Sequence, residues 1–303
     1  MMEPVLRVNG KNANPNEGNV VTDWPKAIWN LGMILASVAL IPFYTTSGSV
    51  LLFVVLTYFT LLIGHSAGMH RMMIHRSFKA IKPVERVLIY IGVLVGMSGP
   101  YGVIKIHDLR DWAQRQNKCH DFFSHKRSYW QDLWWQLTSR FKFTHPPLLQ
   151  IEDHLQNDRF YQFLEKTWRL HQIPLAFILY YFGGLPFVVW GIFVRVSVSV
   201  VGHWTITYFC HNPGQGRWKV KGAYVQASNL PGLGILTYGE CWHNNHHAFP
   251  ESARIGIEKG QSDPTWHFIE FLKTLGWVIE VKLPRPAELR EDLQEQSNNK
   301  YLE

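Results

Sequence analysis

"AIWNLGMILASVALIPFYTT" (residues 27–46) and "SVLLFVVLTYFTLLIG" (residues 49–64) are two uncharged apolar runs that decide the fold of this chain. A helix of about 20 apolar residues spans the hydrocarbon of a bilayer, and the first run has that length. The second run reaches it by continuing to about Ala67. The short uncharged turn "TTSGS" (45–49) joins the two runs. We therefore predict a hairpin of two membrane crossings, at about 27–46 and 48–67.

A second pair of crossings is predicted from "IPLAFILYYFGGLPFVVWGIFVRVSVSVVGHWTITYFC" (residues 173–210), in which Arg195 carries the only formal charge. Gly183, Gly184 and Pro186 disfavour a continuous helix and therefore mark a break. The run divides there into crossings at about 173–184 and 187–210. The sequence thus predicts an all-α integral membrane protein with four transmembrane helices.

The distribution of positive charge predicts the orientation of these crossings. The connections at 45–48 and 183–186 carry no charge, whereas the segments 65–172 and 211–303 contain almost every Lys and Arg. Loops rich in Lys and Arg stay in the cytoplasm. Both termini and both large segments are therefore expected there, where they would form a cytosolic helical cap.

One further apolar run, "VLIYIGVLVGMSGPYGVI" (87–104), is long enough to suggest a fifth crossing. A fifth crossing would place the later histidines on the opposite side of the membrane from the earlier ones. The glycines of this run and Pro100 argue against a straight spanning helix. We predict a surface-lying or re-entrant helix instead.

The composition agrees with a chain that lies partly in lipid and partly in water. Aromatic residues make up 14% of the 303 residues, and Trp and Tyr are typical of membrane interfaces. The mean hydropathy of −0.10 argues against a fully embedded transporter. The net charge is +7, and the basic residues flank the apolar runs. We therefore predict contact with anionic lipid and no nucleic-acid partner.

The two ends of the chain are polar. Residues 1–23 include "NGKNANPNEGN" and show no cleavable signal peptide, so we predict a disordered lead-in. Residues 24–284 form the predicted membrane domain, and 285–303 a charged C-terminal helix or tail. Three cysteines without a CxxC pair argue against disulfides and a zinc ribbon, and favour a reducing, cytosol-facing location.

Histidines carry the chemical signal of this sequence. The stretch "ECWHNNHHAFPESAR" (240–254) holds three of them within five residues. Imidazoles that lie so close together resist protonation, and neutral imidazoles are common metal ligands. Four segments are expected to deliver eight histidines to one side of the membrane. These are His70, His75, His107, His203, His211, His243, His246 and His247.

The spacing of these histidines and their number predict a site for two metal ions. On a helix, residues three or four apart share a face, as do 243, 246 and 247. His203 and His211 lie eight residues apart, which is about two turns, and we expect them on one face as well. Imidazole-rich sites suit Zn, Cu, Fe or Ni. Eight nitrogen ligands exceed what one ion takes, so a dinuclear iron centre is the redox-capable choice. His145, His154, His171 and His267 are interpreted as interfacial polar groups, and the role of His65 stays open.

Three motifs resemble the membrane-bound fatty acid desaturase family, in particular its acyl-CoA (delta-9-type) members and their bacterial relatives. They are "GHSAGMHRMMIHRSFKA" (64–80), "GECWHNNHHAFP" (239–250) and the closing "DPTWHFIEFLKTLGWVIEVKLP" (263–284). The resemblance implies four crossings under a cytosolic cap that holds two Fe²⁺ ions. It implies O₂-dependent insertion of a cis double bond into a fatty acyl-CoA or acyl-lipid, in a bacterial inner membrane. By this resemblance the iron ligands are His70, His75, His107, His211, His243, His246 and His247.

The second histidine box departs from the family pattern His-x-x-His-His. "HDLRD" keeps His107 but has Arg110 and Asp111 at the other two positions. Arginine stays protonated and cannot ligate iron, whereas Asp111 can, and it lies four residues from His107 on the same helix face. His120 and His125 are alternative donors.

A second departure affects the ligand that matches His211. The family has an asparagine four residues before it, and this chain has Thr207 there. His203, one turn earlier still, is the expected substitute. We therefore add Asp111 and His203 to the predicted ligand set.

The surroundings of the site lead to further expectations. Histidine ligands need acceptors on their other ring nitrogen, for which Glu240, Asp108, Asn244 and Asn245 are candidates. Arg71, with Arg76 and Lys79, is interpreted either as a partner for an anionic headgroup or as ordinary loop charge. No fused haem domain, iron–sulfur cysteine cluster or dinucleotide motif is found, so a separate ferredoxin-like or haem-protein electron donor is implied.

Two other functions compete with a desaturase. A membrane di-iron hydroxylase of acyl chains or alkanes would use similar histidine boxes, and the product distinguishes the two. A membrane metal transporter or sensor would need polar groups deep within its crossings, for which Arg195, His65 and His203 are the main candidates. Oxygen uptake that depends on acyl substrate and reductant would exclude the transporter.

Overall fold

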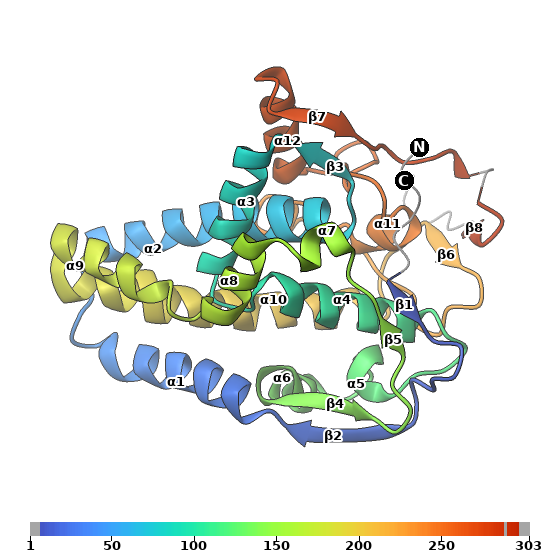
Figure 1. Ribbon diagram of the computed structural model, residues 1–303, viewed down its shortest axis with the longest axis horizontal. Helices are drawn as coiled ribbons and strands as arrows, with labels where there is room; N and C mark the ends of the chain where they lie inside the picture. The colour runs from blue at the N-terminus through green and yellow to red at the C-terminus, as the bar shows by residue number, and fades with distance from the viewer. Residues whose placement is uncertain (1–6, 288–289, 297–303) are drawn as a thin grey trace.

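The computed structural model describes residues 7–287 and 290–296, which are mostly helical. Long helices run side by side at one end, and the short strands gather with α11 at the other (Figure 1). The helix-only end is the expected bundle, and the mixed end is the expected cap.

Helix α1 (Trp24–Leu40) begins where the sequence provides a cap. The side chain of Asp23 accepts a hydrogen bond from the amide of Lys26 at 3.2 Å, and Pro25 occupies the first turn. Pro42 follows shortly after the helix ends and cannot extend it. The helix therefore begins and ends close to the predicted crossing of 27–46.

Helix α2 (Ser47–Phe59) continues without interruption as the π-helical segment η1 (Thr60–Ile74). Thr46 and Ser49 form a reciprocal capping box at its start. The whole helix has 28 residues, so it is on the order of 40 Å long. It is longer than the predicted crossing of 48–67 and carries the chain directly into the cap.

Helix α9 (Gln172–Val188), the π-helical η2 (Val189–Val194) and α10 (Arg195–Cys210) form a hairpin. Gly184 has φ 62° and ψ −156°, which is not helical. Arg195 donates to the side chain of Gln172 at 2.6 Å, although the two residues lie 23 positions apart. A straight helix would separate them by about 34 Å. The break predicted at Gly183, Gly184 and Pro186 is therefore a turn.

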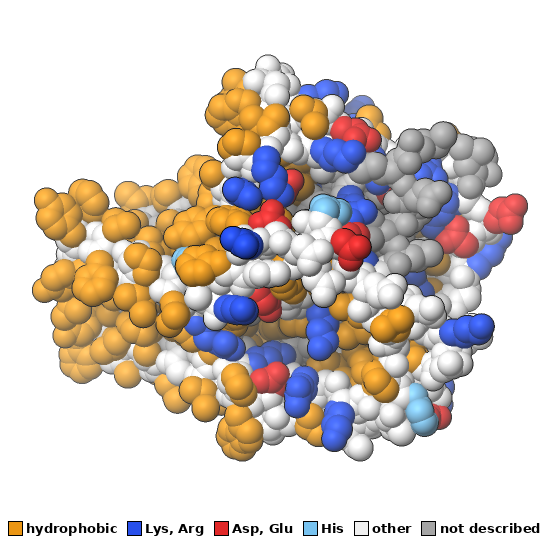
Figure 2. Space-filling model, in the orientation of Figure 1, with side chains coloured by type: hydrophobic (Ala, Val, Ile, Leu, Met, Phe, Trp, Pro, Cys, Tyr) orange, Lys and Arg blue, Asp and Glu red, His pale blue; other side chains and the backbone are white. Residues whose placement is uncertain are grey.

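Two helical stretches are long and apolar enough to cross a membrane, Ser47–Ile74 and the folded-back Gln172–Cys210. Only 28% of the most apolar window of each is buried, unlike the core helix of a soluble protein. Figure 2 shows this end of the molecule covered with hydrophobic side chains, while charged side chains lie over the cap. Exposed apolar side chains of this bundle include Ile28, Leu35, Val38, Leu51, Val54, Phe177, Ile178 and Phe182.

The apolar run 87–104 does not form the single surface-lying or re-entrant helix that we predicted. It is divided between α3 (Lys82–Leu94) and α4 (Pro100–Gln114). Gly96 has φ +81°, which ends α3, and Pro100 occupies the first turn of α4. The break allows α4 to run through the cap, where it carries His107.

Glycines allow α3 to pack closely on η1. A Cβ atom on Gly64 would lie 2.3 Å from the backbone nitrogen of Gly92, and one on Gly68 would lie 2.7 Å from the carbonyl oxygen of Leu88. Small residues at such spacing let two helix backbones approach each other. This contact holds the helix that carries the first histidine box.

The cap also contains short strands, so the prediction of an all-α fold was incomplete. In the described part of the chain the strands pair antiparallel into four two-stranded sheets. The pairs are β1 (Val8–Asn9) with β5 (Leu148–Leu149), β2 (Gly18–Thr22) with β4 (Ser139–Phe143), β3 (Phe78–Ala80) with β7 (Val278–Val281), and β6 (Trp218–Val220) with β8 (Leu293–Glu295). The remaining helices of the cap are α5 (Asp121–Ser124), α6 (Tyr129–Thr138), α7 (Asp153–Gln156), α8 (Arg159–Thr167), α11 (His243–Ala248) and α12 (Pro264–Thr274).

Both chain ends are more ordered than predicted. Residues 7–23, expected to be a disordered lead-in, contain two paired strands and the buried Arg7. Arg7 donates to the carbonyl oxygens of Met73 and Ile74, which are left free at the end of η1. In the predicted C-terminal helix or tail, residues 293–295 form a strand instead. Residues 1–6, 288–289 and 297–303 lie outside the described residues.

The contact between η1 and α3 generates a test. Gly64→Leu should lower the melting temperature of the purified protein in detergent, because the new side chain has no room against the α3 backbone. Overpacking of this kind costs about 1–3 kcal/mol. Gly202→Leu in α10 is the control, since an added Cβ there meets nothing within 4 Å. Equal melting temperatures for the two variants would contradict the close contact.

Candidate metal centre

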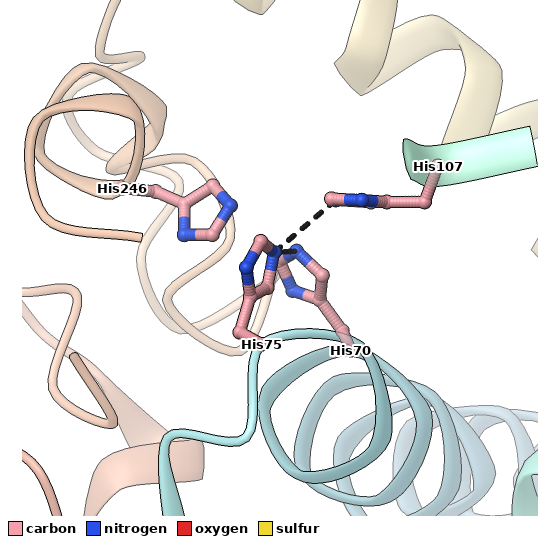
Figure 3. A group of neighbouring side chains, drawn as sticks. All are labelled: His70, His75, His107 and His246. Carbon is pink, nitrogen blue, oxygen red and sulfur yellow. Dashed lines mark hydrogen bonds between the residues drawn. The ribbon is translucent and has the colours of Figure 1, made fainter. Parts of the chain in front are cut away.

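Four histidines from three parts of the fold form a first group. The group contains His70, His75, His107 and His246, one nitrogen of each lying within 4.8 Å of the others. The four rings point toward one another from η1, α4 and α11 (Figure 3). The Nε2 atom of His75 lies 3.2 Å from Nε2 of His70 and 3.2 Å from Nε2 of His107.

The π-helical form of η1 explains how His70 and His75 face the same point. In an α-helix, residues five apart point about 140° away from each other. In η1 the wider turn brings them together, and the amide of His75 donates to the carbonyl of His70 at 3.1 Å. π-helical turns often occur at functional sites for this reason.

A second group of three histidines lies beside the first. It contains His211, at the end of α10, together with His243 and His247 of α11. Nε2 of His243 lies 3.3 Å from Nε2 of His211 and 3.1 Å from Nε2 of His247. The fourth predicted crossing thus delivers the residue that directly follows it, His211, to the site.

The six-residue helix α11 joins the two groups. His246 belongs to the first group, whereas His243 and His247 belong to the second. The ring centroids of His243 and His246 are 5.5 Å apart, and those of His246 and His247 are 5.8 Å apart. The histidine clusters at 70–75, 107, 211 and 243–247 therefore meet, as expected of segments that lie on one side of the membrane.

Two asparagines hold α11 in place. The side chain of Asn244 bonds both backbone groups of Trp218 and the carbonyl of Ala227. The side-chain amide of Asn245 donates to the carbonyl of Ile255 and to Gln261. Asn244 and Asn245, expected to accept from histidine ligands, instead fix the backbone of the helix that carries three of them.

Glu240 makes the contact to a histidine that was expected of it. Its carboxylate lies 2.8 Å from Nδ1 of His70, and it also accepts from Ser66 and Arg71. A carboxylate can only accept, so Nδ1 of His70 carries the proton and Nε2 keeps its lone pair. Although burial acts in the opposite direction, His70 and Arg71 hold the pKa of Glu240 well below its usual range.

Arg71 is not available to a lipid headgroup. Its side chain is 1% exposed and pairs with Asp263 at 2.9 Å and with Glu240 at 3.2 Å. It also donates to the carbonyl of Ala253 at 2.8 Å. Arg71 therefore ties the first histidine box to the segment that follows the third, and Asp263, the first residue of the closing "DPTW" motif, is its anchor.

Asp111, a predicted ligand, lies outside both groups. Its carboxylate is 3.9 Å from Nδ1 of His107, while Asp108 lies 3.3 Å from the same atom. The opposite nitrogen, Nε2, faces the first group. Although burial lowers it, Asp111 and Asp108 raise the pKa of His107 above its ordinary value. Both aspartates thus contact the outer side of this imidazole.

His203, the other predicted substitute, also lies outside both groups. Its ring centroid is 4.9 Å from that of His65, with the rings nearly perpendicular. Eight residues of helix separate His203 from His211, which is about 12 Å along the axis and about 80° around it. The two side chains therefore do not reach the same point.

Arg110 and the alternative donors occupy distinct positions. The Arg110 guanidinium lies 4.6 Å from the ring centroid of Trp204 and donates to Gln136. His120 accepts from the amide of Phe122 and caps α5, away from the groups. His125 is buried and lies 5.2 Å from His211 between ring centroids.

Burial keeps most of the imidazoles neutral. It lowers the pKa of His243 to about 3, and burial together with neighbouring histidines lowers the pKa of His75, His211, His246 and His247 well below the ordinary value. Neutral imidazoles offer lone pairs without losing a proton first. The two groups therefore fit two metal ions that prefer nitrogen ligands.

Sequence reasoning missed several supporting residues. Arg7 holds the end of η1 and pairs with Asp108, yet it lies in the segment expected to be disordered. Asp132, which bonds His125, lies in α6 and was not among the candidate residues. No local pattern marks either residue, because both act through contacts with distant parts of the chain.

The contact between Glu240 and His70 can be tested. Glu240→Gln should weaken metal binding by about 10- to 100-fold, because it removes the charged acceptor that orients His70. The measurement is metal affinity by competition with a chelator. Glu270→Gln, which alters an exposed pair with His267, is the control and should bind as the wild type does. Equal affinities for both variants would contradict this role.

Comparison with known proteins agrees with the site. The fatty acid desaturase family model matches residues 45–258. The chain is 34% identical to delta-9 acyl-lipid desaturase 2 of Arabidopsis thaliana, over 83% of this chain and 80% of that protein. It is 32% identical to sn-1 stearoyl-lipid 9-desaturase of Anabaena variabilis, over 86% and 94%. It is 30% identical to icosanoyl-CoA 5-desaturase of Limnanthes douglasii, over 87% and 74%.

The family match includes both histidine groups and most of the helical bundle. The predicted resemblance is confirmed: the chain belongs to the fatty acid desaturase family, and it is a membrane-associated oxidoreductase that desaturates fatty acyl chains.

Proposed function

We propose that this desaturase uses O₂ and two iron ions to introduce a cis double bond into a long-chain acyl group. The observation that carries the proposal is the sharing of α11 between two adjacent histidine groups. One short helix that contributes histidines to both groups would hold two ions next to each other. Bound iron would supply the redox chemistry that side chains lack for attack on an unactivated methylene.

The chain itself holds and orients the ligands. His70, His75, His107 and His246 would hold one ion, and His211, His243 and His247 the other. Asp111 and His203 are left out of this set. The Asp111 carboxylate lies on the outer side of His107, and the ring of His203 contacts His65, which belongs to neither group. Burial keeps most of the ligands neutral, and Glu240 fixes the tautomer of His70.

The proposed topology has four crossings within a membrane domain of residues 24–284. The crossings are α1, α2 with η1, the part of α9 before Gly184, and η2 with α10. Exposed apolar side chains on these helices and the uncharged tips at 45–48 and 183–186 support it. Arg195 is buried in the second hairpin, where it bonds Gln172 and two backbone carbonyls. These contacts give it a structural role rather than one in ion transport.

The proposed substrate is a fatty acyl chain on a lipid or on CoA. The names of the relatives include both acyl-lipid and acyl-CoA desaturases, acting at carbon 9 or carbon 5. The acyl chain is their common part. Electrons would come from a separate ferredoxin-like or haem-containing protein on the cytoplasmic side of a bacterial inner membrane.

Expression in a desaturase-deficient host tests the activity. The wild type should produce a new monounsaturated acyl chain, detected by mass spectrometry with the double bond located. His75→Ala and His243→Ala should reduce the product to background, because each removes a ligand whose Nε2 lies next to the Nε2 atoms of two other ligands. His267→Ala, at an exposed histidine, should retain activity. An alcohol in place of the alkene would identify a hydroxylase instead.

Cysteine labelling tests the topology. The native Cys119, Cys210 and Cys241 are buried, so their background reaction with a membrane-impermeant maleimide should be low. Ser47→Cys, at an exposed hairpin tip, should react in intact cells. Lys219→Cys, exposed on the cap, should react only after the membrane is permeabilised. Reaction of both positions from the same side would contradict the four-crossing arrangement.

A further inference from the structure

The two histidine groups are unequal. The first group offers four imidazoles and the second only three. At the position three residues after His107 the chain has Arg110, whose guanidinium has no lone pair to donate to a metal. It lies against Trp204 rather than in the second group. The second group is therefore one nitrogen short of the first.

His125 lies next to the second group. Its ring centroid is 5.2 Å from that of His211, the same separation as between His211 and His247 within the group. The side chain is completely buried. His125 thus occupies the immediate surroundings of the group without access to solvent.

One nitrogen of His125 is engaged and the other is free. Nδ1 lies 2.9 Å from the carboxylate of Asp132, which is also buried. Because a carboxylate only accepts, Nδ1 carries the proton and Nε2 has a lone pair. In the described part of the chain Nε2 has no hydrogen-bond partner. A buried acceptor without a donor is costly, so its retention points to an electron-pair acceptor that binds there.

The same arrangement occurs at established members of the two groups. His70 donates from Nδ1 to Glu240 at 2.8 Å, and His211 donates from Nδ1 to the carbonyl of Thr207 at 2.8 Å. In both, Nε2 is directed to neighbouring imidazoles. A carboxylate or carbonyl behind one nitrogen is typical of histidines that bind metals through the other. His125 with Asp132 follows this pattern.

The backbone also holds His125 near His211. His125 has φ +55°, a left-handed conformation that is uncommon for a residue other than glycine. The side-chain amide of Asn212, the residue after His211, donates to the carbonyl of His125 at 3.1 Å. The loop that follows α5 is thus attached to the end of α10. Such strained residues concentrate at functional sites.

We propose that His125, oriented by Asp132, is the fourth nitrogen ligand of the metal ion held by His211, His243 and His247. This inference rests on the proposed two-metal function. Nε2 of His125 is not among the atoms that lie within 4.8 Å of one another. Coordination of one ion by all four residues would therefore require the His125 ring to lie closer to the group.

Ligand substitution with cobalt as the probe tests the proposal. His125→Cys loaded with Co²⁺ should show a thiolate-to-cobalt charge-transfer band in the near ultraviolet, in the difference spectrum against Co²⁺-loaded wild type. A residue that only packs against His211 would produce no such band. His120→Cys, five positions earlier in the same segment, is the matched control and should lack the band. Absence of the band from His125→Cys that still binds cobalt overturns the proposal.

Metal content provides the second measurement. His125→Gln should retain about one iron per chain where the wild type retains about two, and Asp132→Asn should bind the second ion about 10- to 100-fold more weakly. Retention of the first ion shows that the variant is folded. Two tightly bound irons in His125→Gln would overturn the role of His125 while leaving the two-metal function intact. Fewer than two irons in the wild type would contradict the two-metal centre, and with it the role of His125.

Discussion

The structure depends on bringing seven imidazoles together, most of them uncharged, inside the protein. Burial and mutual repulsion oppose the protonation of most of these imidazoles, so their lone pairs remain available. Lone pairs that face one another without donors between them are unfavourable unless a cation joins them. The requirement to hold such a cluster explains why ion pairs, asparagine bonds and a widened helix surround it. Each of these features fixes the position of a segment that carries a ligand.

The network around Arg71 is the clearest example of this support. A buried guanidinium is stable only when its donors are paired. Here Glu240 and Asp263 neutralise it, and backbone carbonyls take its other donors. Glu240 also accepts a hydrogen bond from Nδ1 of His70, and Asp263 accepts from the amides of Ile255 and Gly256. One charge network therefore fixes the first histidine box, the loop after the third and the start of α12 relative to one another.

Sequence reasoning predicted the parts of this protein that follow from local patterns. The apolar runs and the Gly183–Pro186 break located the long helices, and the spacing of His243, His246 and His247 located the helix shared by both groups. Sequence reasoning failed where contacts between residues far apart in the chain determine the position of a side chain. Arg7 is ordered because it satisfies the carbonyls at the end of η1, and no pattern in a polar N-terminal segment shows that. Asp111 and His203 had suitable chemistry. However, Asp111 lies near Nδ1 of His107, whereas Nε2 faces the first group, and His203 lies about 12 Å along α10 from His211.

The length of the second helix sets the depth of the metal centre relative to the membrane. The hydrocarbon of a bilayer is about 30 Å thick, whereas the continuous α2 and η1 helix is on the order of 40 Å long. With the proposed topology, about 10 Å of helix extends beyond the hydrocarbon on the cytoplasmic side. That excess carries His70 and ends beside His75. An acyl chain in the adjacent leaflet then needs to move only a short distance to reach the site. With this topology the headgroup or carrier would stay in water, which is consistent with the acyl-lipid and acyl-CoA desaturases among the relatives.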